Sequence, residues 1–149
     1  MTVDDPRAAW EAAQEAIFDE IRTYGRPKTG YFAGQDVLLL QTKGAKSGEH
    51  RVSPLTFTRD GERLVIVASK GGAPTNPAWF TNLVANPIVT VESGGEKFQA
   101  RATPITAGPE RDRLYAQHAS TFPGFLEYER QTSRTIPVVL LERNRSAGG

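Results

Sequence analysis

The stretch VLLLQTKGAKSGEHRVSPLTFTRDGERLVIVAS, residues 37–69, combines apolar segments of strand length with two tight turn signals. One turn, at residues 43–48, carries two glycines, and the other, Asp60-Gly61, is a strong hairpin signal. Short connections of this kind join antiparallel strands. Pro54 marks an irregularity or a sheet edge, because proline cannot donate a hydrogen bond to a neighbouring strand. We therefore expect three strands, at residues 37–42, 50–58 and 63–69.

Helical patterns and further hairpins surround this stretch. Residues 6–24 form an amphipathic pattern that begins with Asp5-Pro6 and ends before Gly25. About six strands are expected, and hairpins outnumber strand–helix–strand units, which predicts an antiparallel small barrel flanked by helices. The buried face of the first helix is expected to hold Trp10, Ala13, Ile17, Ile21 and Tyr24. The later elements are expected at 88–92, 97–104 and 136–142 (strands), and at 109–120 and 123–130 (helical).

Length and composition indicate one globular domain over residues 1–149, with an N-terminal helical segment at 1–25 and a flexible tail at 143–149. The chain has no cysteine, which excludes disulfides, thiol redox chemistry and cysteine-ligated metals. Its two histidines, His50 and His118, lie far apart in the sequence, so no metal site is expected. The longest apolar runs have strand length, and no signal-peptide pattern is present, so we expect a cytoplasmic protein.

The net charge of +1 hides an uneven distribution along the chain. Residues 1–25 carry a net −4, whereas residues 26–70 carry eight basic against four acidic residues, a net +4. A basic segment of this kind favours an anionic ligand. Nucleic acid is the least favoured partner, because single-strand binding needs aromatic side chains among the basic ones and residues 43–53 contain none.

Two glycine-containing loops carry the candidate anion sites. The first holds Lys46 and Arg51 around a flexible turn, and the second holds Lys70 beside Gly71 and Gly72. Glycines allow main-chain N–H groups to converge, and the basic side chains add positive charge, which suits a phosphate or a carboxylate. The alternatives remain a solvated hairpin turn for the first loop and a plain connector for the second.

Two further segments carry side chains suited to a planar ligand. Asn76-Pro77 is expected to start a short helix, in which Trp79 is most simply a core residue and Asn82 could hydrogen-bond a ring edge. Residues 122–128 place aromatic side chains at every third position, which share one face if the segment is helical. They predict either ordinary core packing or an aromatic wall beside a substrate.

Six motifs over roughly residues 30–142, taken together, show a specific resemblance. In this order they resemble the deazaflavin-dependent nitroreductase and quinone reductase family of actinobacteria, which uses coenzyme F-420. The resemblance implies a mainly β (α+β) split β-barrel of the FMN-binding, pyridoxamine-oxidase-like type, flanked by helices. The motifs are LLLQTKGAKSG at 38–48, RVSPL at 51–55, DG at 60–61, VASKGGAP at 67–74, NPAWFTNLVANP at 76–87 and TSRTIPVV at 132–139.

The resemblance also implies a site. Ser69 and Tyr128 would be catalytic. Ser69 would hydrogen-bond the acceptor's oxygen, and Tyr128 would orient the substrate or donate a proton, which water could also supply. The substrate pocket would be formed by Phe122, Phe125 and Tyr128. The cofactor contacts would come from Lys46, Arg51, Val52, Ser53, Pro54, Ala68, Ser69, Lys70, Gly71, Trp79 and Asn82, and no metal is implied.

The implied reaction is hydride transfer from the reduced deazaflavin to an electron-poor planar acceptor, such as a quinone, an enone or lactone, or a nitro compound. In the nitroimidazole-activating member, tyrosines occupy all three aromatic positions of the segment matching residues 122–128. Here Phe122 and Phe125 replace two of them, which predicts a more apolar pocket.

The alternative function is that of a carrier, which binds F-420 or a flavin without turnover. The expected partners are a small-molecule electron acceptor and an F-420-reducing dehydrogenase that indirectly supplies the reduced coenzyme. Neither nucleic-acid binding nor stable membrane insertion is expected, and the chain is expected to be a monomer or a weak homodimer.

Overall fold

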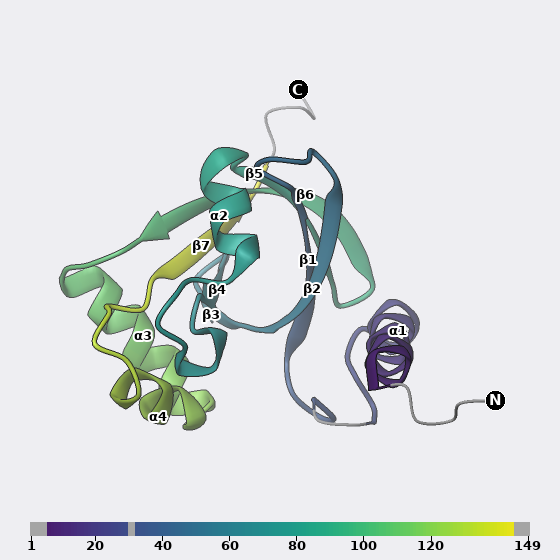
Figure 1. Cartoon of the computed structure of the whole chain (residues 1–149), viewed down its shortest axis with the longest axis horizontal. Coiled ribbons are helices and arrows are strands. Elements are labelled where there is room, and N and C mark those ends of the chain that lie inside the picture. Colours follow the sequence, from purple (N-terminus) through teal and green to yellow (C-terminus); the bar gives the residue numbers. More distant parts are fainter. Residues whose placement is uncertain (1–5, 30–31, 145–149) are drawn as a thin grey trace.

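The two edge strands of one curled antiparallel sheet are consecutive in the chain (Figure 1). In the computed structural model, which describes residues 6–29 and 32–144, the strands lie in the order β2-β1-β5-β6-β7-β4-β3. Because only Phe57 separates the edge strands β2 and β3, the chain itself bridges the open side of an incomplete barrel. The strands are β1 (Val37–Lys43), β2 (His50–Thr56), β3 (Thr58–Asp60), β4 (Arg63–Val67), β5 (Ile88–Ser93), β6 (Glu96–Ile105) and β7 (Val138–Arg143).

The single strand expected at residues 50–58 is wrong, since the structure divides it into β2 and β3. Phe57 causes the division. Its side chain is buried in the barrel core, and its N–H donates to the carbonyl of Asp36 at 3.1 Å, which continues the β1–β2 register by one residue. The chain thereby leaves the edge beside β1 and enters the opposite edge beside β4. Seven strands result in the described part of the chain, rather than about six.

The predicted hairpins are confirmed. β1 pairs antiparallel with β2, with Leu39 opposite Pro54, and this places Pro54 on an edge strand as proline requires. β3 pairs with β4 through the Asp60-Gly61 turn, where Gly61 adopts a φ of +63°. β5 pairs with β6 in the same antiparallel sense. The last strand extends to Arg143, the first residue of the expected tail, and residues 145–149 lie outside the described residues.

Three of the helices cover one end of the barrel and part of its outer face. The helix α2 (Ala78–Ala85) covers one end of the barrel, where Phe80 and Leu83 pack with the inward residues of the strands. The helices α3 (Pro109–Thr121) and α4 (Gly124–Arg130) cover the outer face of β4 and β7, and Leu114 is buried there. Apolar burial on both faces supplies the main stabilising free energy of the fold.

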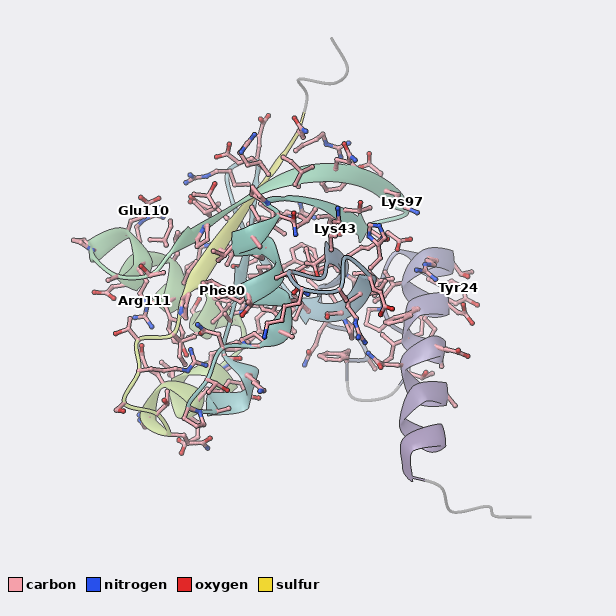
Figure 2. The ribbon with its side chains drawn as sticks, turned by 45° about the horizontal axis from the view of Figure 1, so that its top comes forward. Tyr24, Lys43, Phe80, Lys97, Glu110 and Arg111 are labelled. Atoms are coloured by element: carbon pink, nitrogen blue, oxygen red, sulfur yellow. The ribbon has the colours of Figure 1, made fainter. Side chains whose placement is uncertain are left out.

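The helix α1 (Pro6–Tyr24) packs on the outer face of β1 and confirms the predicted helix at residues 6–24. Ile17 and Ile21 contact this face as expected, but Tyr24 is 61% exposed and does not belong to it. The side chains of Trp10 and Ala13 lie outside the described ones. The N-terminal part of the helix extends beyond the sheet (Figure 2). None of the described helices is long and apolar enough to cross a membrane.

Candidate functional site

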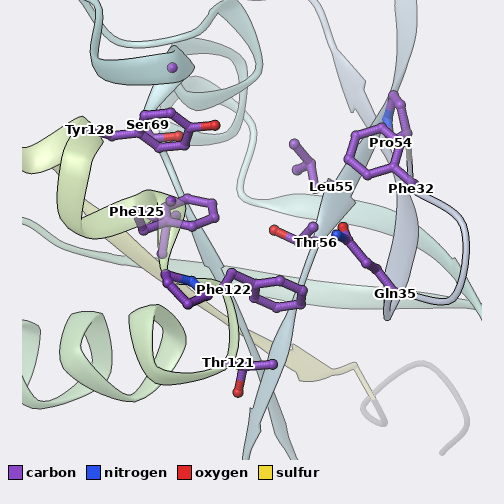
Figure 3. Close-up of a pocket in the computed structure, with 14 residues that line it drawn as sticks. Phe32, Gln35, Pro54, Leu55, Thr56, Ser69, Thr121, Phe122, Phe125 and Tyr128 are labelled. Atoms are coloured by element: carbon purple, nitrogen blue, oxygen red, sulfur yellow. The ribbon is translucent and has the colours of Figure 1, made fainter. Parts of the chain in front are cut away.

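A cavity of about 320 Å³ lies where the barrel is open, between the edge strand β2 and the end of β4 (Figure 3). Four segments that are separated in the sequence form its walls. They are the loop between α1 and β1, the end of β2, the end of β4 with the loop that follows it, and the junction of α3 with α4. The cavity is lined by Phe32, Gln35, Pro54, Leu55, Thr56, Val67, Ser69, Gly71, Thr121, Phe122, Pro123, Gly124, Phe125 and Tyr128.

The aromatic residues predicted to form a pocket do lie together on one wall. Phe122 and Phe125 have ring centroids 6.4 Å apart, and Phe125 and Tyr128 have centroids 5.2 Å apart in an edge-to-face arrangement. The hydroxyl of Tyr115 donates to the carbonyl of Phe125 at 2.5 Å, which fixes this wall to α3. Burial raises the pKa of Tyr115 to about 12, so this hydroxyl stays protonated. The wall is therefore rigid, mostly apolar and open to the cavity.

The loop after β4 carries main-chain donors beside the cavity. The short 3₁₀ turn η1 (Lys70–Gly72) has three successive positive φ values, +47° for Lys70, +64° for Gly71 and +85° for Gly72. Within the described part of the chain, the N–H groups of Lys70 and Gly71 donate to no other group. Consecutive N–H groups left free by such a turn form a concavity that suits an anion. Ser69, which is 7% exposed, lines the cavity beside this turn.

Arg134 holds this loop from behind, and its role could not be predicted from spacing alone. Its guanidinium donates to the carbonyls of Ala73 at 2.9 Å, Ser69 at 2.9 Å and Ala68 at 3.1 Å. It also donates to the side-chain oxygen of Asn76 at 2.8 Å. Asn76 was expected to cap α2, but it makes no such bond, and α2 begins at Ala78. With its carbonyls bound by Arg134, the loop leaves N–H groups for a ligand.

The first predicted anion loop lies at the β1–β2 hairpin. Lys46 is exposed on the turn, and Arg51 is exposed on β2, where it lies 3.8 Å from a carboxylate oxygen of Glu49. Asn82 of α2 is buried and anchors this hairpin. Its side-chain oxygen accepts from the N–H of Ala45 at 3.1 Å, and its amide donates to Thr42 at 3.2 Å. Asn82 thus uses both polar atoms within the protein, and its contact with a cofactor stays a prediction.

The other predicted cofactor residues divide into two groups. Pro54 and Gly71 line the cavity, as does Ser69. Ser53 is half-buried on β2, while Val52 packs on the outer cluster beneath α1. Ala68 and Trp79 belong to the barrel core, the latter edge-to-face with Phe80 at 6.5 Å. These residues do not line the cavity, so their proposed contacts with a cofactor remain predictions.

His118 is a polar residue near the site that the sequence analysis missed. It is fully buried on α3, and burial lowers its pKa from 6.5 to about 4, so the ring is neutral. A recognisable signal existed: His118 follows Leu114 by four residues and Tyr115 by three, which places it on the apolar face of a helix. Thr56, which contacts this ring and lines the cavity, was also missed.

Comparisons with known proteins bear on the family and the fold of this chain. The family model for F420H(2)-dependent quinone reductases matches residues 16–143. An F420H(2)-dependent quinone reductase of Mycobacterium tuberculosis strain H37Rv is 43% identical over 108 residues, which are 71% of this chain and 72% of that protein. A solved F420-H2 dependent reductase, FDR-A, is 36% identical, with a TM-score of 0.66, and the match covers 72% of this chain and 94% of that one.

A more distant structure bears on the fold alone. A candidate pyridoxamine 5'-phosphate oxidase of Listeria innocua is 13% identical, with a TM-score of 0.54, and the match covers 91% of this chain and 94% of that one. This likeness confirms the predicted split barrel of the pyridoxamine-oxidase type. The resemblance inferred from the six motifs is confirmed as well. The chain is therefore an oxidoreductase that belongs to the F420H(2)-dependent quinone reductase family, whose cofactor is coenzyme F420.

Proposed function

We propose that this protein transfers a hydride from reduced coenzyme F420 to an apolar, planar, electron-poor acceptor, with a quinone as the preferred class. The observation that carries this proposal is the cavity between the aromatic wall of Phe122, Phe125 and Tyr128 and the donor-rich loop of Ser69–Gly71. One side of such a cavity suits a flat apolar ring, and the other suits an oxygen or an anion.

The residues present fit the coenzyme, because the main-chain donors beside the cavity and the lysines on the two predicted anion loops suit its anionic tail. When bound, the reduced deazaflavin supplies a hydride from its C5 carbon. The protein's part is to hold the two reactants in contact and to exclude water. Lys46, Arg51 and Lys70 would bind the phosphate and the tail carboxylates. Ser69 would donate a hydrogen bond to the acceptor's oxygen, and Tyr128 would orient the acceptor.

The composition of the aromatic wall supports a preference among acceptors. Phe122 and Phe125 present only carbon atoms to the cavity, so they provide no hydroxyl groups for a polar nitro compound. Quinones and conjugated lactones bury more apolar surface against such a wall than nitroimidazoles do. We therefore propose efficient reduction of quinones, reduction of conjugated lactones, and weak activity toward nitroimidazoles.

A carrier without turnover is the competing function. It would need the anion loops but no open space beside the aromatic residues, and these residues line an open cavity instead. This observation favours the enzyme. A cytoplasmic location and a separate dehydrogenase that reduces the coenzyme complete the proposal.

Two measurements on the purified protein test it. Fluorescence quenching should show binding of oxidised coenzyme F420, and addition of menadione should oxidise the reduced coenzyme with steady-state turnover. The double substitution Lys46→Ala and Lys70→Ala should weaken coenzyme binding by ~10-fold or more, because it removes two charged contacts. Lys97→Ala, on the β5–β6 hairpin (Figure 2), is the matched control. Binding without turnover would support the carrier, and absence of binding would refute both functions.

A further inference from the structure

A buried chain of three side chains reaches from the protein interior to the cavity. The ring of His118 lies between two threonine hydroxyls, with Nδ1 3.2 Å from Oγ1 of Thr58 and Nε2 3.3 Å from Oγ1 of Thr56. The same ring packs against Phe122 and Phe125, with centroids at 5.1 and 4.6 Å. Thr58 is buried on β3, whereas Thr56 is at the end of β2 and lines the cavity.

The hydrogen bonds of this chain determine one another. Burial keeps the His118 ring neutral, so one ring nitrogen carries a hydrogen and the other accepts. Among the described residues, Nδ1 of His118 is the single hydrogen-bond partner of the Thr58 hydroxyl. A buried hydroxyl that does not donate leaves its hydrogen unpaired, which is unfavourable. Thr58 therefore donates to Nδ1, and the ring hydrogen resides on Nε2.

The consequence appears at the cavity. Because Nε2 donates to Thr56, the Thr56 oxygen uses a lone pair toward His118, and its own hydrogen must point elsewhere. Thr56 lies on the cavity wall opposite Phe125 and beside Gln35 (Figure 3). Among the described residues His118 is the single hydrogen-bond partner of this hydroxyl, so its hydrogen is free to point into the cavity that Thr56 lines.

We propose that Thr58 and His118 fix the hydroxyl of Thr56 as a hydrogen-bond donor to a carbonyl oxygen of a molecule bound in the cavity. That oxygen belongs either to the quinone or to the coenzyme ring, and the chemistry is the same for both. In this scheme Thr56 contacts the ligand, and His118 is a positioning residue that acts through Thr56. The inference rests on the proposed function for the identity of the ligand, but the orientation of the hydroxyl does not depend on it.

The first test determines which ring nitrogen of His118 carries the hydrogen, and it requires neither a bound ligand nor turnover. ¹⁵N NMR of histidine-labelled protein distinguishes a protonated ring nitrogen from a bare one. The signals of His118 are separated from those of His50 with the variant His50→Gln. At neutral pH, His118 should carry its hydrogen on Nε2 and have a bare Nδ1. A hydrogen on Nδ1, or a doubly protonated ring, would overturn the proposal.

The second test measures how substitutions of Thr56 change coenzyme binding and quinone turnover. Thr56→Val keeps the shape of the side chain but removes the donor, and Thr56→Ser restores it. The loss of one such hydrogen bond should weaken the affected step by about 3- to 10-fold, and the serine variant should recover it. Thr103→Val, at an exposed position on β6, is the control.

The same test shows whether Thr56 donates to an oxygen of the coenzyme or to an oxygen of the quinone. A raised coenzyme Kd with an unchanged quinone KM assigns the oxygen to the coenzyme, and the reverse assigns it to the quinone. A valine variant that equals the wild type in both quantities refutes the proposal. If the wild-type protein neither binds the coenzyme nor turns over, the proposed function fails, and the NMR result alone then decides the orientation of Thr56.

Discussion

Lowering the pH from 7 to 5 should destabilise this protein mainly through His118. Burial lowers the pKa of this ring from 6.5 to about 4 in the folded chain. Between these values the unfolded chain binds a proton that the folded chain does not, so acid favours unfolding. The contribution of the neutral His118 ring to the free energy of unfolding is fully present above about pH 6.5, and it is lost progressively as the pH falls toward 4.

The magnitude follows from the size of the pKa shift. The full shift corresponds to roughly 3 kcal/mol, of which about 2 kcal/mol is lost between pH 7 and pH 5. Asp60 does not interfere in this range. Hydrogen bonds from Arg113 and then Arg63 lower the pKa of its carboxyl below the usual 3.8, so the stability it contributes is present above that value and is lost only at still lower pH.

Urea denaturation at the two pH values measures this difference, with the buried Trp79 as a fluorescence reporter. His118→Gln removes the titrating ring, and its free energy of unfolding should change much less between pH 7 and pH 5 than that of the wild type. His50→Gln, at an exposed position, should behave like the wild type. The reasoning is refuted if the His118 variant loses as much stability on acidification as the wild type does.

Substitutions at three positions test the residues that support the site. Arg134→Met should lower the free energy of unfolding by about 3 kcal/mol, because it leaves several loop oxygens without a donor, and should weaken coenzyme binding more than Arg134→Lys does. Thermal denaturation and coenzyme titration measure the two effects. Gly72→Ala should lower the free energy of unfolding by about 1–3 kcal/mol, because the φ of Gly72 is +85° and the new methyl group would lie 3.1 Å from Cβ of Gln131. Urea denaturation measures this loss, and an unchanged free energy of unfolding would show that the loop shifts to accommodate the methyl group. Asn82→Ala should lower stability by about 2 kcal/mol, since it leaves the Ala45 N–H unpaired, and unchanged hydrogen exchange at that amide would contradict this.

Local signals predicted most of the fold, because turns and periodicity act over a few residues. The Asp60-Gly61 turn and the helix at Pro6–Tyr24 were both predicted from such signals. The break at Phe57 was not, because its neighbours on both sides are compatible with a strand. Only the closure of the barrel requires β2 and β3 to occupy opposite edges, and that requirement is long-range.

The site was predictable where its residues are close in sequence. Phe122, Phe125 and Tyr128 share a segment, and their spacing indicated a common face that the structure retains. Arg134 looked like one polar residue in a polar segment, because its partners lie about 60 residues earlier. His118 lay among polar neighbours, so its helical position on the apolar face was overlooked. Long-range polar contacts of this kind have no periodic signature.

Three segments that we predict to face the ligand are each held by a buried or half-buried polar side chain from elsewhere in the chain. Asn82 of α2 binds the hairpin that carries Lys46, His118 of α3 binds the strand that carries Thr56, and Arg134 binds the loop that carries Lys70. None of these three anchors lines the cavity. The relative positions of the predicted ligand groups therefore depend on side chains that do not touch the ligand. Because a displacement of about 1 Å can reduce a rate by about 100-fold, substitutions at the anchors should impair turnover even where the protein remains folded.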